Sequence, residues 1–148
     1  LLCLRTWLRE FDWHDGLTLY SHDIKISQNA FDLENNYGVE LFRIGDIAQA
    51  KIHFEKSTKL SPGWWTNWNN LGAVYEREGN LAVAESYYRR SIDNGNYYLA
   101  YENYGKILYR QNKIEELKNF LEKEALIRLP YNQVLRQLQY LLYNQKNF

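Results

Sequence analysis

The sequence contains no methionine, a single cysteine and only two prolines in 148 residues. The lone Cys3 excludes an internal disulfide and any metal site built from several thiolates. The absence of methionine even at position 1 indicates a segment excised from a longer protein. Neither sign of charge is in excess, with 18 basic and 18 acidic residues, so no net field attracts nucleic acid and we expect no nucleic-acid partner.

Long hydrophobic runs are also missing, since no stretch approaches the roughly 20 apolar residues that cross a bilayer. The opening stretch LLCLRTWL, residues 1–8, is apolar apart from Arg5 and Thr6. We interpret it either as a buried helix end or as the remainder of a cut transmembrane helix. It is not a signal peptide, because a charged start and a small-residue cleavage site are both lacking.

Aromatic residues are abundant, with 13 Tyr, 5 Trp and 6 Phe, which excludes a disordered chain. A pattern of Asn, an apolar or aromatic residue and Gly occupies residues 36–38, 70–72 and 103–105, at intervals of 34 and 33 residues. A turn-forming pair follows seven residues after each glycine: Gly45-Asp46, Gly79-Asn80 and Asn112-Lys113. A fixed interval of this length predicts a repeated structural unit.

Three glycines fall in the middle of an expected helix: Gly38, Gly72 and Gly105. Glycine inside a helix costs about 1 kcal/mol, so we expect another helix to approach closely at these positions. Ala50 and Ala84 are small enough to let a second helix pack there, while Phe54 and Tyr88 are expected to fill the space between units. The turn pair ends the first helix, because Gly and Asn accept the left-handed conformation of a C-cap.

A 34-residue period with this order of residues resembles the tetratricopeptide repeat (TPR), a helix–turn–helix unit that stacks into a solenoid. The resemblance implies an all-α fold of stacked antiparallel helix pairs, divided into units 31–64, 65–97 and 98–131. In the third unit the pattern is degraded, because Leu117 replaces the small alanine.

The flanking residues extend the array. Residues 1–30 are interpreted as an N-terminal helical segment with an incomplete leading repeat, because Gly16 and Tyr20 fall one period before Ala50 and Phe54. Residues 132–148 predict a C-terminal capping helix with Asn132 as its N-cap. Its apolar residues follow helical spacing: Val134, Leu135, Leu138, Leu141 and Leu142.

A solenoid of this kind presents the first helix of each unit along a concave groove. One repeated row there is Asn36, Asn70 and Asn103, and a second is Arg43, Arg77 and Arg110, with Phe42 and Tyr109 beside the arginines. An amide can hold an extended peptide backbone, as in the similar asparagine ladders of O-GlcNAc transferases, and arginine can pair with a carboxylate. Alternatively, Asn is simply common at this position in such repeats, Arg favours a helix C-terminus, and the two aromatic residues are packed.

Catalysis has little support in the sequence. His14-Asp15 and His22-Asp23 are interpreted as solvated surface pairs, because the further histidines of a metal site are lacking. His53 has no obvious partner. The sequence contains no phosphate-binding glycine loop, nucleophile elbow or zinc-ligand spacing. We therefore expect no catalytic residue, no metal and no cofactor in this segment, which is not predicted to be an enzyme.

Three tryptophans cluster at the boundary between the first two units: Trp64, Trp65 and Trp68. Trp68 is expected to pack inside its repeat. Trp64 and Trp65 lie in the turn, and at least one of them is predicted to be partly exposed. Packing is the favoured interpretation of this pair, and contact with a sugar or a neighbouring domain is the alternative.

A narrower resemblance covers RTWLREFDWHDGLTLYSHDIKISQN, residues 5–29. This stretch is similar to the junction between the last transmembrane helix and the repeats in the transmembrane-and-TPR O-mannosyltransferases. The resemblance implies a membrane tether before or at Leu1–Leu4 and a repeat region on the extracytoplasmic side. The catalytic acidic residues of that family lie in membrane loops that this chain lacks, so none is carried over.

Two functional hypotheses follow. The first is a non-catalytic scaffold that binds a protein or peptide in its concave groove. The second is an accessory tail that positions a protein acceptor for a membrane-embedded glycosyltransferase. Self-association through the exposed solenoid ends is a third possibility.

Overall fold

The computed structural model describes residues 16–145. The predictions for Leu1–Leu4, Arg5 and the His14-Asp15 pair lie outside these residues. The described residues contain no strand, and their helices follow one another in short steps: α2 (Gly16–Ile26), α3 (Phe31–Ile44), α4 (Ile47–Leu60), α5 (Trp65–Arg77), α6 (Leu81–Asn94), α7 (Tyr98–Arg110), α8 (Ile114–Phe120), the π-helical turn η1 (Leu121–Ala125), α9 (Leu126–Arg128) and α10 (Gln133–Gln145).

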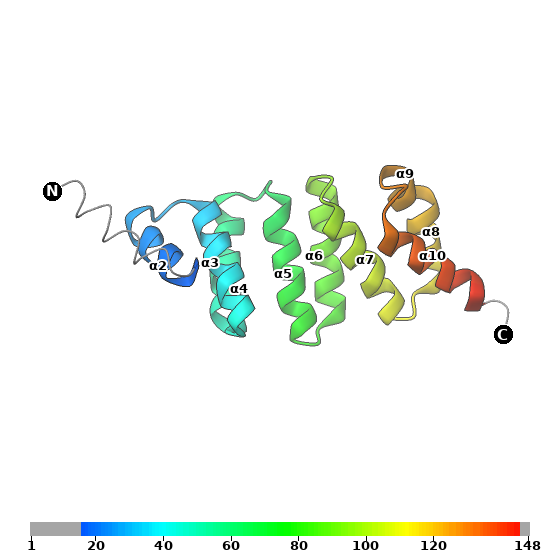
Figure 1. Ribbon diagram of the computed structural model, residues 1–148, viewed down its shortest axis with the longest axis horizontal. Helices are drawn as coiled ribbons and strands as arrows, with labels where there is room; N and C mark the ends of the chain where they lie inside the picture. The colour runs from blue at the N-terminus through cyan, green and yellow to red at the C-terminus, as the bar shows by residue number, and fades with distance from the viewer. Residues whose placement is uncertain (1–15, 146–148) are drawn as a thin grey trace.

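From α2 to α7 the helices stack side by side along the long axis of the molecule in their chain order, and α8, α9 and α10 group together at the other end (Figure 1). The pairs α3/α4 and α5/α6 run antiparallel, and each is joined by a tight turn. The predicted all-α solenoid with a terminal helix is thereby confirmed. The division into units 31–64, 65–97 and 98–131 stays an interpretation.

The turns between paired helices follow the predicted chemistry. Gly45, Gly79 and Asn112 have φ values of 90°, 80° and 58°, in the left-handed region that ends a helix. The next helix starts at once in the first two units, because the Asp46 and Asn80 side chains accept hydrogen bonds from backbone N–H groups of α4 and α6. Each such N-cap contributes about 1 kcal/mol.

The close approach expected at two of the glycines is present. A Cβ at Gly38 would lie 2.7 Å from the Phe54 ring, and one at Gly72 would lie 2.5 Å from the Tyr88 ring. The two rings therefore pack first within their own helix pair, where we had expected them to fill the space between units. Each ring also belongs to a buried cluster that includes residues of the next unit, Trp68 for Phe54 and Ile107 for Tyr88, so both rings do both.

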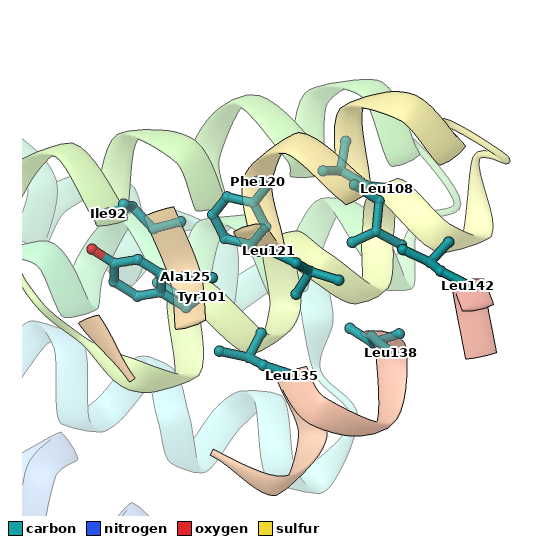
Figure 2. Close-up of a cluster of buried hydrophobic side chains, with 11 residues drawn as sticks. Ile92, Tyr101, Leu108, Phe120, Leu121, Ala125, Leu135, Leu138 and Leu142 are labelled. Carbon is teal, nitrogen blue, oxygen red and sulfur yellow. The ribbon is translucent and has the colours of Figure 1, made fainter. Parts of the chain in front are cut away.

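The C-terminal core gathers around α10, whose side chains meet those of α7, α8 and η1 in one cluster (Figure 2). Three leucines of α10 are buried there, Leu135, Leu138 and Leu142. The predicted N-cap is confirmed, since the Asn132 side chain accepts a hydrogen bond from Leu135 N at 3.1 Å. Across residues 16–145, no helix is long and apolar enough to cross a membrane.

Candidate binding groove

Two adjoining hollows lie over the first helices of the repeats. One, of about 120 Å³, is lined by Val39, Phe42, Phe54, Asn70 and Ala73. The other, of about 380 Å³, is lined by Phe42, Ala73, Glu76, Arg77 and Arg110. Because the hollows share Phe42 and Ala73, they form one groove across α3, α5 and α7.

Four of the eight predicted groove residues line these hollows: Phe42, Asn70, Arg77 and Arg110. The other four do not: Asn36, Arg43, Asn103 and Tyr109. Tyr109 instead packs against the C-terminal cluster, which favours the packed interpretation of that residue. Phe42 is partly buried against the cluster of the first unit and still lines both hollows.

The asparagine row ties neighbouring first helices together. Asn70 Nδ2 donates to Asn35 Oδ1 at 2.8 Å, and Asn103 Nδ2 donates to Asn69 Oδ1 at 3.0 Å, one repeat apart in each case. One donor of each amide is therefore used inside the protein. The Asn70 Oδ1 atom accepts no hydrogen bond from the described residues, so this oxygen and the second N–H of the amide remain for a ligand.

The acceptors of this ladder were missed by sequence reasoning. Asn35 and Asn69 are buried, at 7% and 5% exposure, and the same position in the third unit is Glu102, which accepts from Asn132 Nδ2 at 2.7 Å. The doubled pairs Asn35-Asn36 and Asn69-Asn70 were the available indication. A buried amide needs a hydrogen-bond partner, and the next helix provides it.

The arginine row divides into paired and unpaired members. Arg43 donates through Nε and Nη2 to Glu40 Oε2, at 2.9 and 2.7 Å. Arg110 donates to Glu76 Oε1. The guanidinium of Arg77 is exposed and makes no hydrogen bond or ion pair with the described residues. One repeated position therefore holds three different electrostatic environments.

A tyrosine holds the acidic side of the groove in place. The Tyr88 hydroxyl donates to Glu76 Oε2 at 2.5 Å, while Oε1 of the same carboxylate accepts from Arg110. Burial raises the pKa of Tyr88, and the hydrogen bond to Glu76 raises it further. The hydroxyl therefore stays a donor at neutral pH, and the Glu76 carboxylate is held on two sides.

The expectation for His53 was wrong. His53 Nδ1 lies 2.7 Å from Glu34 Oε2, and Lys56 Nζ lies 2.5 Å from Oε1 of the same fully buried carboxylate. A buried carboxylate needs such compensation, because desolvation of an unpaired charge is costly. Sequence reasoning missed the pair because 19 residues and a turn separate its members.

The remaining histidine and tryptophan predictions concern His22 and the three clustered tryptophans. His22 is exposed and lies 3.3 Å from Asp23 Oδ1, and residues 16–145 contain no group of three potential metal ligands. Trp64 stacks on Trp65 with ring centroids 4.9 Å apart and remains 39% exposed, as expected of one of the pair. Trp68 is buried, and its Nε1 donates to Pro62 O at 2.7 Å.

Comparison with known proteins agrees with this architecture. Residues 35–63 and 66–94 match the family model described as tetratricopeptide repeat. The two matched stretches correspond to the pairs α3/α4 and α5/α6. A 57-residue stretch is 37% identical to the tetratricopeptide repeat domain-containing protein PYG7, chloroplastic, of Arabidopsis thaliana. That match covers 38% of this chain and 19% of PYG7, so the chain spans about a fifth of that relative's length.

Solved TPR structures share the fold. The first TPR of Spaghetti (RPAP3) bound to the HSP90 peptide SRMEEVD has a TM-score of 0.71 at 22% identity, covering 80% of this chain and 96% of that one. The APC/C hetero-tetramer Cut9–Hcn1 has a TM-score of 0.78 at 19% identity, covering 89% of this chain and 25% of that one. At these identities the likeness establishes the fold alone.

The narrower resemblance to membrane O-mannosyltransferases gains no support. The family model and the proteins named above point to TPR repeats, without a membrane enzyme among them. The membrane tether and the extracytoplasmic location rested on that resemblance and gain no support either.

Proposed function

We propose that this chain is a non-catalytic scaffold that binds an extended segment of another protein in the groove across α3, α5 and α7. The observation that carries the proposal is the continuity of the two hollows, which places apolar side chains beside the Arg77 guanidinium and the unused oxygen and N–H of the Asn70 amide. The peptide held by the Spaghetti (RPAP3) repeat in its solved structure supports a peptide as the ligand class.

The chemistry of the groove suits an extended backbone. The Asn70 amide has a free oxygen and a free N–H, and an extended strand offers both a donor and an acceptor to such a group. Val39, which is 41% exposed, and the neighbouring Phe42 and Ala73 provide apolar contacts for side chains of the segment. Backbone contacts then give affinity, and these apolar contacts give selectivity.

The structure identifies the variant that tests this proposal. Replacing all three row asparagines would also remove the ties from Asn70 to Asn35 and from Asn103 to Asn69, so lost binding would be confounded with altered packing. Ala73→Gln is better, because Ala73 lines both hollows and a longer neutral side chain there narrows the groove. Ala82→Gln is its matched control on the exposed surface of α6.

The full chain and the two variants are panned against a displayed random-peptide library, after circular dichroism has shown equal helix content. We expect the parent and Ala82→Gln to enrich the same peptides and Ala73→Gln to lose them. Peptides held equally well by Ala73→Gln would contradict a binding site in this groove. A concentration-dependent mass in sedimentation would separately indicate the third hypothesis, self-association.

A further inference from the structure

Arg77 is the one member of the arginine row whose charge is not neutralised inside the described protein. Both of its sequence neighbours are glutamates, and both are committed elsewhere. Glu76 accepts from Arg110 and Tyr88, and the two carboxylate oxygens of Glu78 lie 3.1 and 3.2 Å from Lys51 Nζ. The guanidinium therefore lies on the wall of the groove with its donors free.

The charge on this wall matches a single carboxylate. Arg77 and Arg110 contribute two positive charges and Glu76 one negative charge, which leaves one positive charge to neutralise. Guanidinium binds carboxylate in a planar, bidentate geometry, and such charge-assisted bonds are about twice as strong as neutral ones. A doubly charged phosphate would exceed the available positive charge and would face the Glu76 carboxylate.

The apolar hollow lies one helical turn from this charge. Ala73 and Arg77 are four residues apart on α5, which corresponds to about 6 Å along a helix. In an extended chain, side chains at positions i and i+2 point to the same face and lie about 6.6 Å apart. For a segment that runs along α5 within the groove, one apolar side chain in the hollow by Val39 and Phe42 thus places the side chain two residues away beside Arg77.

We propose that the groove selects an extended segment in which an apolar side chain and an aspartate or glutamate stand two residues apart, the acid being bound by Arg77. This inference rests on the proposed peptide-binding function and names the chemistry of its ligand. Arg43 takes no part in the selection, because Glu40 already occupies its guanidinium.

The test uses the same displayed library, with peptides inside a loop so that no terminal carboxylate is offered. The full chain, Arg77→Gln and Arg43→Gln are panned in parallel. We expect the parent and Arg43→Gln to enrich an apolar residue with Asp or Glu two positions away, and Arg77→Gln to enrich the apolar residue without the acid. Enrichment without any acidic preference in the parent would overturn this inference and leave the proposed function standing.

A second measurement is made on the best peptide and its version with Glu or Asp changed to Gln or Asn. The amide version should bind the parent about tenfold more weakly, and Arg77→Gln should bind both versions equally, as for a lost charge-assisted hydrogen bond. Arg43→Gln should bind within about twofold of the parent. If Arg77→Gln still discriminates between the two peptides, another group recognises the acid. If the library yields no groove-dependent peptide at all, the proposed function itself fails.

Discussion

The second and third helix pairs share one sequence pattern, but the packing of the second helix against the first differs between them. In the second pair, α6 is a continuous helix of 14 residues, and the Tyr88 ring fills the space over Gly72. In the third, the corresponding helix is broken into α8, the π-helical turn η1 and α9. The space over Gly105 is filled by Leu138 of α10, 3.0 Å from the position of a Cβ.

The cause lies in two small residues that the third unit lacks. Ala84, fully buried in α6, is replaced by the larger Leu117 in α8. Ser91, whose hydroxyl donates to Trp65 O at 2.7 Å, is replaced by Glu124 in η1. A leucine and a glutamate take more room than an alanine and a serine, so the second helix cannot close on the first in the same manner.

Glu124, which occupies the position of the serine, pairs with an arginine of α6. Glu124 Oε2 accepts from Arg89 Nη1 of α6 at 2.7 Å, and this hydrogen bond raises the pKa of Arg89. The π-helical turn inserts extra backbone at this point, which is how helices absorb a local misfit. The difference shows that small residues allow the two helices of a repeat to pack closely on each other. Where these residues are missing, side chains of the terminal helix α10 fill the space over the first helix.

Removing a contact between the terminal helix and the third unit should cause the largest loss of stability. Leu135→Ala deletes a fully buried side chain of α10 and leaves a cavity against α7 and η1. We expect the free energy of unfolding to fall by about 3 kcal/mol, measured by urea denaturation. Tyr140→Ala on the exposed face of the same helix is the control and should change it by less than about 0.5 kcal/mol. Equal effects would show that α10 does not close the third unit.

Adding a methyl group to the two glycines sharpens the comparison. In Gly72→Ala the new Cβ meets the Tyr88 ring, which is enclosed, and overpacking exceeds the gain in helix propensity. We expect a loss of about 2 kcal/mol. In Gly105→Ala the Cβ meets the flexible end of Leu138, and the change should stay within about 0.5 kcal/mol. Chemical denaturation of both variants measures the difference, and a larger loss for Gly105→Ala would refute this account.

The smallest effect concerns the position that holds Ser91 in one unit and Glu124 in the next. Ser91→Ala removes a buried hydrogen bond to Trp65 O and should cost about 1 kcal/mol. Glu124→Ala removes an ion pair on the partly exposed surface and should lower the free energy of unfolding by about 0.5 kcal/mol or less. This loss should become smaller at high salt, because salt screens the ion pair. Thermal unfolding at two salt concentrations measures both effects. If the effect of Ser91→Ala depended on salt, a neutral buried hydrogen bond would not be its cause.

Much of the architecture was predictable because it depends on local residue chemistry. The turns at Gly45 and Gly79 follow from the few residues that accept a left-handed backbone, and the N-cap at Asn132 from its short polar side chain. The candidate site was predictable only as rows of residue types. Which row members line the groove, and which arginine is free, depended on partners in other helices.

The sequence by itself determined the repeated helix pairs, their turns, the glycines at close contacts and the apolar face of α10, because each of these follows from a residue's own size, polarity or backbone freedom. Only the tertiary structure decided that His53 compensates the buried Glu34, that Asn70 is tied to Asn35, and that Arg77 keeps its charge unpaired. The energy of a hydrogen bond or ion pair depends on which side chains meet across helices. The residue type at one position does not specify its partner, because the partner comes from another helix.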